Sequence, residues 1–108
     1  MAQEKKLIRL GDCRNYPGVG MIVTIHYTAY IKDGQKIDSS RERGEMFEFA
    51  VGGGEVIRGL EEEVQKMSLG ERASLTFSPD KAYGKAGIPG IVPANATLVY
   101  DTELIGFH

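Results

Sequence analysis

Cysteine and histidine side chains, which could act as nucleophile, general base or metal ligand, are few and far apart in this sequence, whereas the plentiful carboxylates are expected mostly on exposed faces. The single cysteine, Cys13, follows a Gly-Asp turn signal, and the two histidines are His26 and His108. A cysteine nucleophile needs a histidine base beside it, and a zinc site needs closely spaced histidines or cysteines. We therefore interpret Cys13 as a turn residue and His26 as a sheet-surface histidine, and we expect no metal and no cofactor.

Asp38 is the carboxylate whose position most favours a functional role. It directly follows the apolar Ile37 at the edge of the predicted core, where a carboxylate must be hydrogen-bonded or ion-paired. Tyr27 and Arg43 are the candidate partners. The alternative is structural: an Asx turn that opens the Ser39-Ser40 loop. With no nucleophile or base nearby, an enzyme built on this chain must catalyse a reaction that makes no covalent bond.

The pattern of residues 55–67 predicts the one clear helix. Its apolar positions recur at i, i+4 and i+7 and share one face; they are Leu60, Val64 and Met67. Glu61 to Glu63 are expected to be exposed in its first turn, and Gly70 is expected to close it. A helix this short must pack on another apolar surface, which would leave a concave mouth at its start. The preceding Gly52-Gly53-Gly54 lacks the lysine of a phosphate-binding loop and is interpreted as a flexible turn.

Alternation of apolar and polar residues predicts strands in most of the remaining chain. The patterns cover residues 7–10, 21–31, 37–38, 47–51, 72–78 and 97–105. Asp33-Gly34 predicts a hairpin turn after the longest of them. The fold class is therefore α+β, with an antiparallel sheet of about five strands curled around one short helix in a single domain, residues 1–108.

Residues 78–96 form a predicted loop without regular structure. Long loops inside small domains are usually functional, and this one carries the apolar or aromatic Tyr83, Ile88, Ile91 and Val92. We expect it to overhang a binding site. The alternative is that it only caps the core.

Length and charge limit the classes of function. The chain has 108 residues, 42% of them hydrophobic, and a net charge of −2, which favours neither nucleic acid nor an anionic membrane as a partner. No apolar segment follows the N-terminal residues 1–6, so no secretory signal is predicted. A lone cysteine fits a reducing compartment, and the cytoplasm is the expected location.

Spaced motifs along nearly the whole chain, from Gly11 to Leu104, resemble the FKBP-type peptidyl-prolyl cis-trans isomerases, the tacrolimus-binding immunophilins. The motifs are His26-Tyr27-Thr28, Asp33-Gly34, Asp38-Ser39-Ser40, Phe47-Glu48-Phe49, Val56-Ile57-Arg58-Gly59, Met67-Ser68-Leu69-Gly70-Glu71, Pro79 with Ala82-Tyr83-Gly84, Gly87-Ile88-Pro89-Gly90-Ile91 and Ala96-Thr97-Leu98. The length is similar to that of the small, single-domain, cytosolic members.

The resemblance implies a catalytic set and a surrounding ligand pocket. Asp38, the Ile57 N–H and the Tyr83 hydroxyl would contact the bound ligand or substrate. The pocket residues are Tyr27, Ile37, Asp38, Arg43, Phe47, Glu55, Val56, Ile57, Leu60, Tyr83, Ile88, Ile91 and Tyr100. The implied partners are proline-containing peptides and proteins, together with macrolides such as tacrolimus and rapamycin, and the chain is expected to be a monomer.

Three pocket positions depart from the usual family pattern. Leu60 stands where tryptophan is common, and Ile37 and Tyr100 stand where phenylalanine is usual. Lost aromatic contacts predict macrolide affinity weaker by about 1–3 kcal/mol. Two functions are therefore weighed: an active isomerase, which is favoured, and a module that binds a proline loop of a partner with little turnover.

Overall fold

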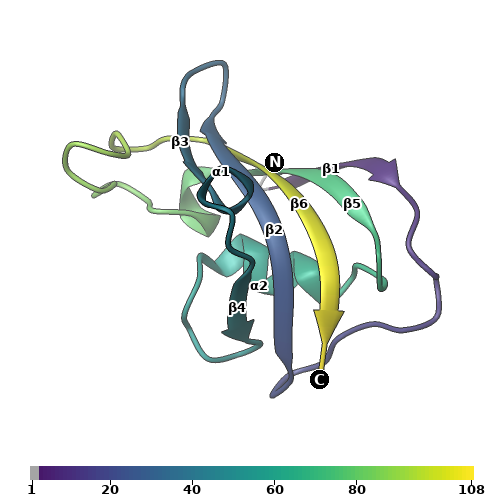
Figure 1. The fold of residues 1–108 in the computed structure, drawn as a ribbon. Helices are drawn as coiled ribbons and strands as arrows, with labels where there is room; N and C mark the ends of the chain where they lie inside the picture. Colours follow the sequence, from purple (N-terminus) through teal and green to yellow (C-terminus); the bar gives the residue numbers. More distant parts are fainter. Residues whose placement is uncertain (1–2) are drawn as a thin grey trace.

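Six antiparallel strands form one curved sheet in the computed structural model, which describes residues 3–108 (Figure 1). The strands are β1 (Gln3–Arg9), β2 (Ile22–Ile31), β3 (Lys36–Ser39), β4 (Phe47–Ala50), β5 (Arg72–Phe77) and β6 (Leu98–Phe107). Their order is β1-β5-β6-β2-β3, and β4 also pairs with β2. The predicted α+β class is confirmed, with six strands in place of about five. Met1 and Ala2, part of the predicted domain, lie outside the described residues.

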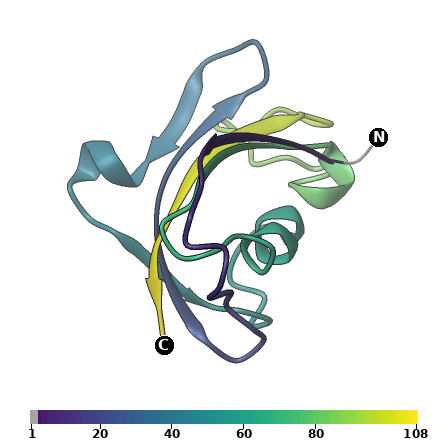
Figure 2. The same cartoon turned by 90° about the vertical axis from the view of Figure 1, so that its right-hand side faces the viewer.

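The concave face of the sheet wraps around helix α2 (Arg58–Val64), as Figure 2 shows. Leu60, Val64 and Met67 are all buried there against the sheet, which confirms the predicted apolar face. Gly59 lies so close to β5 that a Cβ on it would stand 2.4 Å from the Phe77 ring. The helix therefore approaches the sheet too closely at this position for any side chain larger than hydrogen. In residues 3–108 no helix is long and apolar enough to cross a membrane.

Helix α2 is shorter than residues 55–67 predicted. It begins after an extended N-cap, Ile57, with ψ of 149°. It ends in a tight turn, in which the Met67 N–H donates to the Val64 carbonyl at 3.2 Å. Gly70, expected to close the helix, has φ of +89° and serves the later turn into β5. The apolar spacing correctly identified the buried face, but it does not locate where the backbone leaves helical geometry.

The three glutamates of α2 are not simply exposed, contrary to the prediction. Glu61 Oε2 accepts the N–H groups of Gly52 at 2.8 Å and Gly54 at 3.3 Å. Glu62 pairs with Lys81 at 2.7 Å. Glu63 is buried and pairs with Lys66 at 3.2 Å. The first two carboxylates thus attach neighbouring loops to the helix.

The segment predicted as a charged loop after β3 forms a one-turn helix, α1 (Ser40–Arg43). The side chain of Ser39 caps it by accepting the Glu42 N–H at 3.3 Å, and Gly44 ends it with φ of +72°. Four residues are too few for a periodic pattern, so only the Ser cap could have indicated this turn.

Strand β2 is the centre of the sheet, with β6 along one edge and both β3 and β4 along the other. Its predicted alternation is confirmed, and the Asp33-Gly34 turn joins it to β3, with Asp33 at φ of +57°. Thr28 is an exception, because it is buried on the face expected to be polar. Ser39, the last residue of β3, and Arg41 of α1 cover it, at 3.0 and 3.3 Å from its hydroxyl.

The long segment between β5 and β6 is more ordered than predicted. A 3-10 turn, η1 (Pro79–Lys81), follows β5. Ile88 and Val92 then exchange backbone hydrogen bonds, each of 2.8 Å, and the Asn95 N–H donates to Gly84. Local turns therefore hold this segment in the shape of a loop projecting beside β3 (Figure 1).

Candidate functional site

Two adjoining cavities open between the start of α2, the end of β3 and the loop of residues 78–96, and they share Tyr27, Tyr83 and Tyr100. The inner cavity, of about 100 Å³, is lined in addition by Phe47, Glu55, Val56, Ile57 and Leu60. The outer cavity, of about 320 Å³, is lined in addition by Ala29, Ile37, Asp38, Ile88, Ile91 and Val92. The concave mouth predicted at the start of the helix is present.

Aromatic side chains from four strands pack against one another at the inner cavity. The Tyr27 ring of β2 stacks on Tyr100 of β6, with centroids 5.6 Å apart and planes 21° apart. It meets Phe47 of β4 edge-on, at 5.7 Å and 75°. Tyr100 also packs against Phe77 at 5.7 Å. Because these rings are held by sheet strands and by one another, the walls of the cavity are preformed.

The polar side of the outer cavity is built on Asp38. Its carboxylate accepts the Tyr27 hydroxyl and a guanidinium N–H of Arg43, as the sequence predicted. It also accepts the N–H of the next residue, Ser39, at 2.8 Å, whereas an Asx turn would use the N–H two residues on. The Arg43 guanidinium carbon lies 5.9 Å from the Tyr27 ring centroid. One carboxylate therefore holds the phenol and the guanidinium together at the rim.

Two of the shared tyrosines, Tyr27 and Tyr100, carry neutral hydroxyls. Burial raises the pKa of Tyr100, and the neighbouring Tyr83 adds to the rise. Burial also raises the pKa of Tyr27, and the hydrogen bond to Asp38 acts in the same direction. A raised phenol pKa keeps the proton in place at physiological pH. The cavities therefore present hydroxyl donors rather than phenolates.

Twelve of the thirteen predicted pocket residues line these two cavities, and Arg43 is the one that does not. Arg43 instead contacts Asp38, which lines the outer cavity. Two lining residues were missed, Ala29 and Val92. Ala29 follows Tyr27 by two positions on one strand face, which is a usable signal. Val92 lies in the loop without periodicity, and its burial depends on the Ile88 hydrogen bonds, so no pattern indicated it.

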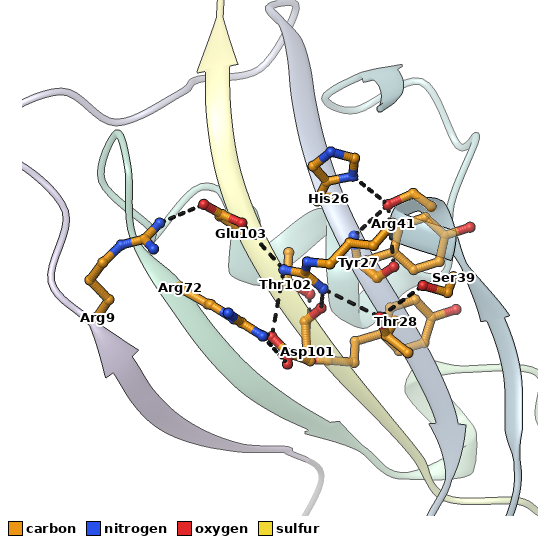
Figure 3. Close-up of polar contacts among 12 residues, drawn as sticks. Arg9, His26, Tyr27, Thr28, Ser39, Arg41, Arg72, Asp101, Thr102 and Glu103 are labelled. Atoms are coloured by element: carbon orange, nitrogen blue, oxygen red, sulfur yellow. Dashed lines mark hydrogen bonds and ion pairs between the residues drawn. The ribbon is translucent and has the colours of Figure 1, made fainter. Parts of the chain in front are cut away.

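The candidate nucleophile and base lie elsewhere. Cys13 is exposed in a turn, with φ of +56°. His26 projects from β2 away from the cavities, and its Nδ1 lies 3.0 Å from the Ser40 hydroxyl (Figure 3). Among residues 3–108, no three His, Cys, Asp or Glu side chains are grouped to hold a metal ion. The lining groups can bind, orient and desolvate a ligand.

A half-wrapped antiparallel sheet with an aromatic-lined cavity at its mouth thus frames the candidate site. The model of the FKBP-type peptidyl-prolyl cis-trans isomerase family matches residues 13–105, and the chain belongs to this family. It is 53% identical to FK506-binding protein 1 of Yarrowia lipolytica over 103 residues, 95% of each chain.

Two animal proteins are similar over nearly the same length. Identity is 50% to peptidyl-prolyl cis-trans isomerase FKBP1A of Xenopus laevis, over 105 residues and 97% of each chain. It is 53% to peptidyl-prolyl cis-trans isomerase Fkbp12 of Drosophila melanogaster, over 95 residues and 88% of each chain. The resemblance found in the sequence motifs is thereby confirmed.

Proposed function

We propose that this protein accelerates rotation about X–Pro peptide bonds by binding the twisted amide in the paired cavities. The observation that carries the proposal is the aromatic inner cavity of about 100 Å³ in a chain of this isomerase family. A cavity of this size suits a single pyrrolidine ring, with Leu60 beneath it. The outer cavity would take the residue that precedes proline.

The chemistry requires no covalent step. Rotation of the amide faces a barrier of about 20 kcal/mol that arises from resonance. The twisted transition state has lost that resonance and is less polar than the planar amide. A dry aromatic cavity therefore stabilises the transition state more than the ground state. The lack of a nearby nucleophile and base fits this reaction.

Three groups are assigned roles at the reacting amide. The Ile57 N–H, just before α2, donates to no acceptor among residues 3–108 and is available for a substrate carbonyl. The Tyr83 side chain is 37% exposed and borders both cavities, so its hydroxyl can reach a second carbonyl. Asp38, fixed by Tyr27 and Arg43, would face the carbonyl of the residue before proline.

We also propose that the pocket binds macrolides such as tacrolimus and rapamycin, more weakly than a pocket with a tryptophan floor would. The Yarrowia relative is called an FK506-binding protein, and FK506 is tacrolimus, which supports macrolide binding. Leu60 offers a ligand less contact area at the cavity floor than an indole would. We further propose that the protein is a monomer in the cytoplasm.

A protease-free isomerisation assay on an Ala-Leu-Pro-Phe peptide tests the isomerase proposal. We expect catalysis above the uncatalysed rate, and a loss of more than about tenfold in the double variant Tyr83→Phe, Asp38→Val, since two contacts to the amide are removed. Tyr30→Phe is the matched control for Tyr83→Phe, because it removes the hydroxyl of another exposed tyrosine, on strand β2. No rate above background, with calorimetric binding of the peptide, would favour the binding module.

A further inference from the structure

The edge of β2 that faces β3 and β4 is interrupted at Tyr27. Ile25 pairs with Phe47 of β4, and Ala29 pairs with Asp38 of β3. Midway between them, Tyr27 has no strand partner on this edge among residues 3–108. In an antiparallel strand, the N–H and C=O of such a residue point to the same side. Both would be left unsatisfied in a buried position, which is costly.

The hydroxyl of Ser40, the first residue of α1, occupies the missing position. Its Oγ accepts the Tyr27 N–H at 2.8 Å and donates to the Tyr27 carbonyl at 3.2 Å. Ser40 is fully buried, and Figure 1 shows α1 between β3 and β4 along this edge. One side chain thus makes the two contacts that a neighbouring strand would supply.

We infer that Ser40 is a positioning residue for the isomerase site, acting through the backbone of Tyr27. The inference rests on the proposed function, because Tyr27 lines both cavities and its hydroxyl bonds Asp38. A shift of the Tyr27 backbone would move the phenol, the stacked Tyr100 ring and the Asp38 carboxylate together. Displacements of about 1 Å in such groups can cost large factors in rate.

The helix that carries Ser40 is itself fixed by contacts independent of the cavities. Arg41 reaches across the outer face of the sheet to Glu103 at 3.4 Å and to the Asp101 carbonyl at 3.4 Å. Ser39 meets Thr28 at 3.0 Å. Figure 3 shows these groups on β2, β6 and α1. The residues before and after Ser40 in the sequence, Ser39 and Arg41, therefore hold it in place.

Proton counting at Ser40 also assigns the tautomer of His26. The hydroxyl has one proton and two lone pairs, and the Tyr27 contacts use the proton and one lone pair. His26 Nδ1, 3.0 Å away, faces the remaining lone pair and must therefore donate. If Ser40 gave its proton to His26 instead, the Tyr27 carbonyl would lose this partner. His26 is only partly buried and can turn to water, so the first arrangement is favoured.

The test compares Ser40→Ala with Ser39→Ala, a matched loss of hydroxyl that also weakens α1 but does not touch Tyr27. In wild-type protein above the histidine titration, nitrogen-15 NMR should show His26 protonated at Nδ1. In Ser40→Ala, the Tyr27 amide should exchange about tenfold faster than in Ser39→Ala, after correction for global stability. The value of kcat/KM should be about fivefold lower in Ser40→Ala than in Ser39→Ala, the factor that corresponds to the free energy of one ordinary hydrogen bond.

Two results would overturn the inference. Tyr27 exchange and kcat/KM in Ser40→Ala equal to those of the wild-type protein would remove the positioning role. A wild-type His26 protonated at Nε2 with Nδ1 bare would refute the proton assignment, and this measurement needs no variant to fold. If the wild-type protein lacks isomerase activity, the proposed function fails, whereas amide exchange and the tautomer still decide whether Ser40 replaces the strand neighbour.

Discussion

Replacing Leu60 with tryptophan should tighten tacrolimus binding. Leu60 is 2% exposed and forms the floor of the inner cavity of about 100 Å³. An indole there would present on the order of 50 Å² more apolar surface to a ligand, about 1 kcal/mol at 25 cal/mol per Å². Contact with an aromatic face adds about 0.5–1.5 kcal/mol. The expected gain is about 1–3 kcal/mol, or roughly 5- to 150-fold in Kd.

The gain in affinity should be separable from any effect on stability. A larger side chain in a filled core costs typically about 1–3 kcal/mol of folding free energy, so Leu60→Trp is expected to melt at a lower temperature without ligand. Isothermal titration calorimetry gives Kd for both proteins. Because the chain has no tryptophan, the new indole is also a unique fluorophore at the cavity floor and reports ligand contact directly.

Leu60→Met is the matched control, since it keeps an apolar side chain of similar volume but adds no ring. Its Kd should stay within about twofold of wild type. Quenching or a spectral shift of the indole without a gain in affinity would show that the ligand reaches the floor but that the floor is not the limiting contact. That result would refute the reasoning from lost aromatic area.

Three further predictions concern packing and pH. Gly59→Ala should destabilise the protein by about 1–2 kcal/mol in urea unfolding, because the close approach to Phe77 outweighs the helix-propensity gain of about 1 kcal/mol; a higher midpoint would contradict this. Bonds from Arg72 lower the pKa of Asp101, so its contribution is present above the unfolded value of about 4 and is lost as pH falls through the folded value. Asp101→Asn should therefore cost about 1 kcal/mol at pH 7, and this cost should shrink as pH falls below the unfolded value. The isomerase rate should be flat between roughly pH 6 and 8, whereas a bell-shaped profile over that range would implicate His26.

Features that repeat along the chain could be predicted from it. Alternation along residues 21–31 identified the central strand because one face of that strand is buried and the other is partly exposed to solvent. Spacing at Leu60, Val64 and Met67 identified the buried face of α2 for the same reason. The partners of Asp38 were also inferred, since a carboxylate at a core edge needs compensation and Arg43 follows it by five residues.

Features that depend on a single distant contact could not be predicted. Helix α1 has no periodicity, and Ser40 is buried only because β3 and β4 leave a gap in the sheet beside Tyr27. Glu63 lies in a run of glutamates, which suggests a solvent-exposed surface, yet it is only 7% exposed. In each case the tertiary neighbours overrule the local preference.

The two hydrogen bonds from the glycine turn to Glu61 bear on how a ligand enters. Glycine-rich segments are the most mobile part of a folded chain, and closing one over a ligand carries an entropic cost. Here Gly52 and Gly54 are already joined to α2 through one carboxylate, so the rim at Glu55 and Val56 is in place before a ligand arrives. Association should then be limited by diffusion and desolvation rather than by ordering of the loop, and changing Glu61 would alter the on-rate without touching the pocket.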